Sequence, residues 1–120
     1  MSSALIASPF RLPAAPLETD LVAKYFKVLS DPIRVRALEL LDQHGELSVG
    51  ELVERLGQPQ PKVSNHLACL RWCGFVTTRR AQRSVIYRLA DPRVRQLISI
   101  ADSLLDDNAE HVACCQTIDH

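Results

Sequence analysis

Apolar positions recur every three to four residues in five stretches of this 120-residue chain, and that period predicts five helices. The stretches cover residues 20–29, 32–44, 49–56, 61–73 and 92–105. Between the last two, residues 75–79 and 85–89 are rich in β-branched and aromatic residues, which predicts two strands joined by residues 80–84. The expected fold class is therefore mainly α with a small β-hairpin.

Capping residues mark the ends of these helices. Thr19 or Asp20 is expected to cap the first helix, residues 30–32 to separate the first two, and Ser48 to cap the third. Gly74 is expected just beyond the end of the fourth helix. A short helix, a tight turn and a longer helix form a helix-turn-helix, so the following hairpin predicts a winged helix-turn-helix.

Charge is balanced over the whole chain, with 14 basic and 14 acidic residues, but it is unevenly distributed. Every Lys, Arg, Asp or Glu between Pro61 and Ala90 is basic, whereas the segment after Ala90 is mostly acidic. Such a segment beside a helix-turn-helix favours phosphate contact over the alternative of a solvated basic hairpin. The residues expected to contact DNA are Gln60, Lys62, Ser64, Asn65, His66, Arg71, Arg79, Arg80, Gln82 and Arg83.

Four cysteines form two groups, Cys69 with Cys73 and Cys114 with Cys115. Residues four apart on a helix lie on one face, so Cys69 and Cys73 can share one ion. A lone buried cysteine more often serves as a small apolar residue, but two at this spacing with a second pair near the C-terminus favour metal ligands. His111 lies near the second pair and is a weaker candidate.

The same features suggest how the chain is organised. A chain of this length supports one domain. We expect an extended arm at residues 1–17, a winged-helix DNA-binding domain at residues 18–106 and a metal-binding tail at residues 107–120. The first and last helices are expected to present apolar stripes to a second copy of the chain, which predicts a homodimer.

Several classes of protein are not expected. No apolar run is long enough to span a bilayer, and Met1 to Leu17 lacks the features of a secretory signal, so we expect a cytoplasmic protein with reduced thiols and no membrane partner. No nucleophile–base set and no phosphate-binding glycine loop is present, so neither an enzyme nor a small-molecule substrate is expected.

From about Lys24 to Leu105 the chain resembles the ArsR/SmtB family of metal-responsive repressors. The resemblance lies in five segments: residues 29–34, 49–52, 63–67 together with 70–71, 73–76 and 87–89. It implies a winged-helix homodimer that binds double-stranded operator DNA without metal and releases it when metal binds.

Family members place their metal ligands in different elements. Ser48-Val49-Gly50 stands where the arsenic-sensing form has cysteines flanking a valine. Of the zinc-sensing ligands on the last helix, only Asp91 remains. The chain is instead similar to the cadmium- and lead-sensing CmtR branch, which implies Cys69, Cys73 and one tail cysteine of the partner protomer as ligands, with Cd²⁺ or Pb²⁺ as inducer.

Other interpretations of the cysteines stay open. The tail ligand is Cys114, Cys115 or both, and the doubled cysteine departs from the single tail ligand of that branch. Three or four sulfurs also suit trivalent arsenic, and Zn²⁺ is a further candidate. A repressor that senses oxidants through a disulfide between helix and tail is an alternative without metal.

Overall fold

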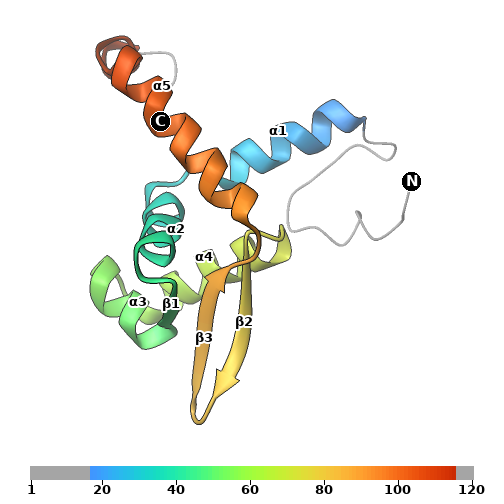
Figure 1. Ribbon diagram of the computed structural model, residues 1–120, viewed down its shortest axis with the longest axis vertical. Helices are drawn as coiled ribbons and strands as arrows, with labels where there is room; N and C mark the ends of the chain where they lie inside the picture. Colours follow the sequence, from blue (N-terminus) through green and yellow to red (C-terminus); the bar gives the residue numbers. More distant parts are fainter. Residues whose placement is uncertain (1–16, 116–120) are drawn as a thin grey trace. The chain divides into compact units, whose positions relative to one another are not determined.

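The computed structural model describes residues 17–115. Along these residues the elements are α1 (Glu18–Val28), α2 (Pro32–His44), β1 (Glu46–Ser48), α3 (Val49–Leu56), α4 (Gln60–Trp72), β2 (Val76–Ala81), β3 (Ser84–Leu89) and α5 (Pro92–Cys114) (Figure 1). They form two compact units whose boundary in the chain lies between Ala90 and Asp91. The predicted fold class is confirmed: five helices and a hairpin follow in the expected order. The predicted N-terminal arm lies almost entirely outside the described residues.

The sheet contains a strand that the sequence did not predict. β1 pairs with β3, Leu47 lying opposite Tyr87, so the antiparallel order is β1-β3-β2. β2 and β3 also extend further than predicted, leaving a two-residue turn at Gln82 and Arg83. Gln82 adopts a φ of 57°, a left-handed conformation that is uncommon for a residue with a side chain. The hairpin therefore stays paired to its tip.

Local caps set the ends of α2 and α3. The Asp31 carboxylate accepts hydrogen bonds from the backbone N–H of Ile33 at 2.8 Å and of Arg34 at 3.3 Å. The Ser48 hydroxyl accepts from the Glu51 N–H at 3.1 Å, and the Glu51 carboxylate accepts from the Ser48 N–H at 2.9 Å. These bonds satisfy N–H groups that a helix start leaves without partners. Both predicted boundaries are confirmed.

The start of α1 differs from the prediction. Leu17, rather than Thr19 or Asp20, is the residue before the first helical turn, and the Asp20 carboxylate accepts the Leu17 N–H at 2.8 Å. Asp20 thus caps from inside the helix. At the other end of α1, the Ser30 hydroxyl donates to the Lys27 carbonyl at 2.7 Å.

Helices α2, α3 and α4 enclose the core together with the sheet. Leu38, Leu52 and the α4 residues Val63, Leu67 and Leu70 are completely buried. Each such side chain contributes roughly 1.5–3 kcal/mol through removal of apolar surface from water. Val63, Leu67 and Leu70 therefore form the inner face of α4, and its opposite face is exposed to solvent.

The end of α4 is fixed by a tight helix-terminating motif. Gly74 has a φ of 82°, its N–H bonds to the Arg71 carbonyl at 3.1 Å, and the Phe75 N–H bonds to the Leu70 carbonyl at 2.9 Å. This is a Schellman motif, in which glycine supplies the left-handed residue at little steric cost. The Phe75 ring then packs edge-on against Tyr25 of α1, with ring centroids 5.4 Å apart. The motif therefore ends α4 at Trp72, with Cys73 as its capping residue, and directs the chain into β2.

In the second unit, α5 is longer than predicted. Its first N–H groups are capped by Asp91, which accepts from the Arg93 N–H at 2.8 Å, and the helix continues past Leu105 to Cys114. The predicted tail covers residues 107–120. Its described part is helical as far as Cys114. None of the helices within residues 17–115 combines the length and apolar character needed to cross a membrane.

Candidate functional site

Helix α4 presents an exposed outer face opposite its buried residues. Asn65, Ala68 and Trp72 are exposed on it, Trp72 to 63%. Eight of the ten residues predicted to contact DNA are exposed, and the other two, Ser64 and His66, are half-buried. The exposed ones are Gln60, Lys62, Asn65, Arg71, Arg79, Arg80, Gln82 and Arg83. Most of the predicted set is therefore exposed to solvent, and its contact with DNA stays a prediction.

One arginine of the hairpin already has an acidic partner. The Arg79 guanidinium donates from Nε to Glu46 Oε2 at 3.0 Å and from Nη2 to Glu46 Oε1 at 2.9 Å. This two-pronged pairing spans β3 and lowers the pKa of the Glu46 carboxyl. Any phosphate that Arg79 contacts must compete with Glu46. Sequence reasoning missed Glu46, because its partner lies 33 residues away and no local pattern signals the pairing.

The Cys69 and Cys73 thiols lie together on the flank of α4. Both are half-buried free cysteines, and the Cys73 N–H donates to the Cys69 carbonyl at 3.2 Å. Burial is the largest cause that raises the pKa of Cys73; the neighbouring Cys69, through charge and a side-chain hydrogen bond, raises it further. The positive charges of Lys24 and Arg34 oppose this rise. The predicted helical pair therefore lies together, and within it the Cys73 thiol has a raised pKa that the charges of Lys24 and Arg34 partly offset.

The other two cysteines lie at the end of α5. Cys114 is exposed as the last helical residue, and Cys115 is half-buried with its N–H bonded to the Val112 carbonyl at 3.2 Å. Within residues 17–115 no group of three or more His, Cys, Asp or Glu side chains is arranged to hold a metal. A single chain therefore supplies the two-sulfur set on α4. The contribution of either tail cysteine stays a prediction.

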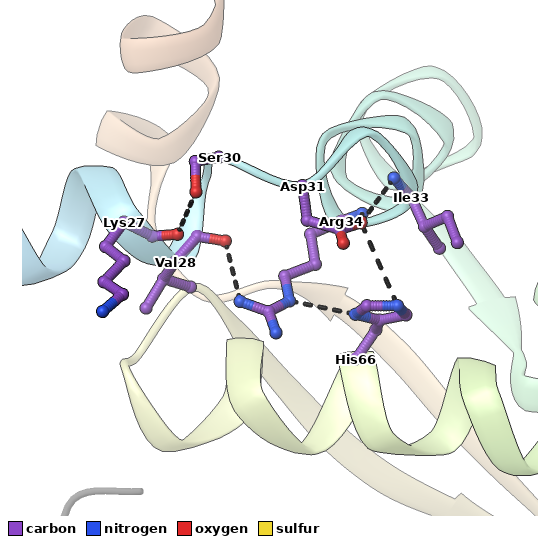
Figure 2. A network of polar contacts seen from close by, with 7 residues as sticks. All are labelled: Lys27, Val28, Ser30, Asp31, Ile33, Arg34 and His66. Atoms are coloured by element: carbon purple, nitrogen blue, oxygen red, sulfur yellow. Dashed lines mark hydrogen bonds and ion pairs between the residues drawn. The ribbon is translucent and has the colours of Figure 1, made fainter. Parts of the chain in front are cut away.

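Figure 2 shows a polar cluster between the α1–α2 junction and α4. Arg34 donates from Nε to His66 Nδ1 at 3.0 Å and from Nη1 to the Val28 carbonyl at 3.1 Å. His66 Nε2 lies 3.9 Å from Asp31 Oδ1, and the His66 side chain is only 14% exposed. Val28, Asp31, Arg34 and His66 are called the Arg34 cluster below. His66, predicted to contact DNA, is largely engaged inside this cluster.

The electrostatics of the cluster favour a neutral histidine. Burial is the largest cause that lowers the pKa of His66, the charges of Arg34 and Lys62 lower it further, and Asp31 opposes them. Since Nδ1 accepts a hydrogen bond from Arg34, the ring proton belongs on Nε2, which faces Asp31.

Sequence reasoning also missed Arg34. A signal was present, because Arg34 shares a helix face with Ala37, Leu38 and Leu41, which are all buried. A charged residue within an apolar stripe requires a polar partner in the fold. The partner itself, His66, lies 32 residues away and is not signalled locally.

A helix-turn-helix formed by α3 and α4, followed by the β2–β3 hairpin, defines a winged-helix DNA-binding protein. Residues 31–78 match the family model described as "Bacterial regulatory protein, arsR family". The chain is also 41% identical over 99 residues to a probable mercury resistance operon repressor of Streptomyces lividans, an alignment that covers 82% of this chain and 78% of the relative. The chain belongs to the arsR family. It is a DNA-binding transcriptional repressor, and not an enzyme.

Solved structures agree with this assignment. The crystal structure of Mycobacterium tuberculosis Rv0081 superposes with a TM-score of 0.76 at 33% identity, covering 83% of this chain and 100% of that one. The solution structure of Mb0332 from Mycobacterium bovis, described as a homodimeric winged helix-turn-helix DNA-binding domain, superposes with a TM-score of 0.70 at 29% identity. That match covers 82% of this chain and 95% of Mb0332.

Proposed function

We propose that this repressor binds its operator as a homodimer and releases it when a soft metal ion, Cd²⁺ or Pb²⁺, binds Cys69, Cys73 and a tail cysteine. The observation that carries the proposal is the assembled thiol pair on α4, the helix whose outer face is expected to enter the major groove. Sensor and DNA-reading surface then belong to one rigid element. Metal binding at the sulfurs therefore acts directly on the face of α4 that is expected to contact DNA.

Sulfur ligands define the class of ion. Thiolates select soft metals over magnesium, calcium or manganese, so the donor set fits cadmium and lead, with zinc and trivalent arsenic as further ions to test. The nearby charges of Lys24 and Arg34 offset part of the cost of forming thiolates on a half-buried face. The third sulfur comes from Cys114 or Cys115, which in this proposal belongs to the partner protomer.

Support for the homodimer comes from exposed apolar surface and from a relative. α1 exposes Phe26 to 60%, and α5 exposes Ile100 to 60% and Leu104 to 59%. Large apolar side chains in a row on a helix mark an interaction surface. The homodimeric state of Mb0332 supports a second copy as the partner. Two copies of α4 can then address two half-sites one DNA turn apart.

The Streptomyces lividans relative favours mercury as a second candidate inducer, since its name assigns it to a mercury resistance operon. Two adjacent sulfurs suffice for an ion that accepts two ligands, so mercury would need Cys69 and Cys73 alone. Cadmium and lead would need the tail. The two candidates therefore differ in their dependence on Cys114 and Cys115.

The deciding experiment is an operator titration of the reduced protein without oxygen. A labelled duplex recovered by the wild type from a randomised pool serves as operator, and cadmium, lead, mercury, arsenite and zinc are added in separate titrations. Absorption reports thiolate-to-metal charge transfer. We expect cadmium or lead to weaken DNA binding about 100-fold, and Cys69→Ser to lose both the absorption bands and the release.

Each other result points to a different inducer. If mercury alone releases the DNA, and still does so when both tail cysteines are replaced by serine, the inducer is mercury and its ligands are Cys69 and Cys73. Release by arsenite alone keeps the sulfurs and changes the inducer. Release by peroxide without any ion, and none with metals, contradicts the metal proposal and supports the thiol redox alternative.

A further inference from the structure

Arg34 joins three elements through one side chain. Its backbone N–H is held by the Asp31 cap of α2 at 3.3 Å, its Nη1 reaches the Val28 carbonyl at the end of α1 at 3.1 Å, and its Nε reaches His66 of α4 at 3.0 Å. Val28 is completely buried and Arg34 half-buried. These bonds therefore fix the guanidinium in place, and through it the position of His66 relative to the α1–α2 junction.

His66 is held from two sides of its ring. Arg34 donates to Nδ1, and the Asp31 carboxylate lies 3.9 Å from Nε2, beyond hydrogen-bonding distance but close enough for charge attraction (Figure 2). A ring that accepts at Nδ1 and faces a carboxylate at Nε2 has one orientation and one tautomer. The cluster therefore sets the rotation of α4 about its own axis at this point.

The thiol pair lies on the same flank of α4 as His66. Cys69 and Cys73 follow His66 by three and seven residues, which places all three side chains along one side of the helix. The charge of Arg34 also acts on the Cys73 thiol. The guanidinium that bonds His66 thus also acts electrostatically on Cys73, and any negative charge added at the sulfurs attracts it away from His66.

We propose that the Arg34 cluster holds α4 in its DNA-binding orientation and that the thiol pair changes this orientation through Arg34. Arg34 is thereby a positioning residue, which acts on DNA through His66 and α4. The first half concerns the repressor without metal. The second half rests on the proposed function, since it requires the sulfurs to bind an ion.

The first half is tested by operator affinity without metal. Arg34→Gln removes the guanidinium and keeps the backbone N–H that donates to the Asp31 carboxylate. His66→Ala removes the ring nitrogen that accepts the hydrogen bond from Arg34. We expect each variant to bind the selected duplex about tenfold more weakly, which lies within the usual range of coupling between sites. The double variant is expected to lose no more than either single variant, because both remove the same bond.

Two controls separate positioning from other effects. Arg36→Gln removes a charge from the exposed side of the same helix, where Arg36 pairs with Glu39 at 3.5 Å, and is expected to bind like the wild type. His66→Asn places an amide oxygen near the position of Nδ1 and is expected to restore most of the affinity lost in His66→Ala. Should Arg34→Gln not fold, the two His66 variants still decide, because both keep Arg34.

Two results would overturn the first half. Additive losses in the double variant would show that His66 contacts DNA independently of Arg34. A loss in Arg36→Gln equal to that in Arg34→Gln would reduce the effect to general charge. Nitrogen NMR of the His66 ring adds a direct check, since the wild type is expected to show a proton on Nε2 and none on Nδ1.

The second half is tested by adding the inducing ion. In Arg34→Gln we expect charge-transfer bands like those of the wild type, together with a metal-driven loss of DNA affinity that shrinks from about 100-fold to about tenfold. An unchanged loss overturns the link through Arg34. A wild type that responds to no ion refutes the proposed function and the second half together, while the metal-free affinities still decide the first.

Discussion

Cys69 lies in the last turn of α4 and Cys73 caps the end of that helix four residues later, whereas Cys114 and Cys115 are consecutive residues at the end of α5. The α4 pair is half-buried, and its spacing is fixed by a helix whose inner face is fully buried. Cys114 is exposed, and the tail pair closes a helix that is exposed from Ser99 to Cys114. The fold therefore surrounds the α4 pair with packed residues and leaves Cys114 open to solvent.

This difference assigns different tasks to the two pairs. A preorganised pair loses little conformational freedom on binding, so it supplies most of the affinity for the ion. A pair that becomes ordered on binding contributes less affinity, but its movement can change the protein's conformation. We expect variants of the α4 pair to affect metal binding, and variants of the tail pair to affect release.

The largest effect is expected from the α4 pair. Cys73→Ser removes a proposed sulfur ligand and is expected to weaken cadmium binding at least about 100-fold. Loss of a residue that only hydrogen-bonds to a metal ligand already lowers metal affinity about 10- to 100-fold. Competition with a coloured chelator measures this affinity. DNA binding without metal should stay within about threefold of the wild type. A variant that retains wild-type metal affinity would remove Cys73 from the site.

The next prediction concerns the pH dependence of metal binding at the α4 pair. Burial raises the pKa of Cys73, so this thiol is protonated at neutral pH and must lose its proton before it binds an ion. Metal affinity therefore rises with pH below that pKa, by about tenfold per pH unit for each proton displaced. Chelator competition between pH 6 and 8 measures the slope, and a flat profile contradicts thiol ligands.

The tail variants are expected to differ from each other. Cys114→Ser and Cys115→Ser change neighbouring residues with different exposure, so one should reduce metal-driven release about tenfold more than the other. Operator titration with each variant measures this. Equal losses indicate that both sulfurs bind, and the absence of loss in either variant confines the site to α4.

The smallest effect concerns reactivity in the absence of metal. The thiolate is the reactive form, and Cys73 is half-buried with a raised pKa, whereas Cys114 is exposed. Iodoacetamide should therefore modify Cys114 several-fold faster than Cys73, as measured by peptide mass spectrometry over time. Faster modification of Cys73 would show that Lys24 and Arg34 outweigh burial.

Features that depend on nearby residues were predicted correctly from the sequence. The Asp31 and Ser48 caps, the end of α4 at Gly74 and the inner face with Leu67 follow from interactions within a few positions. Cys69 and Cys73 belong to this class, because helical spacing alone places them together.

Features that join distant segments were not predicted. β1 is a three-residue strand without an alternating pattern, and only pairing with β3 makes it a strand. Arg34 with His66 and Glu46 with Arg79 are pairs that the fold brings together over more than 30 residues.

The Glu46–Arg79 pair has a consequence for the ionic-strength dependence of operator binding. Each phosphate neutralised by a free cation releases condensed counterions and steepens the fall of affinity with salt by about 0.9 in logarithmic slope. Arg79 exchanges one anion for another and exposes the Glu46 carboxylate when it does so. Its net contribution to counterion release is therefore small. The slope of log affinity against log salt concentration for the wild type should therefore lack the contribution of one hairpin arginine. Glu46→Gln should make this slope steeper.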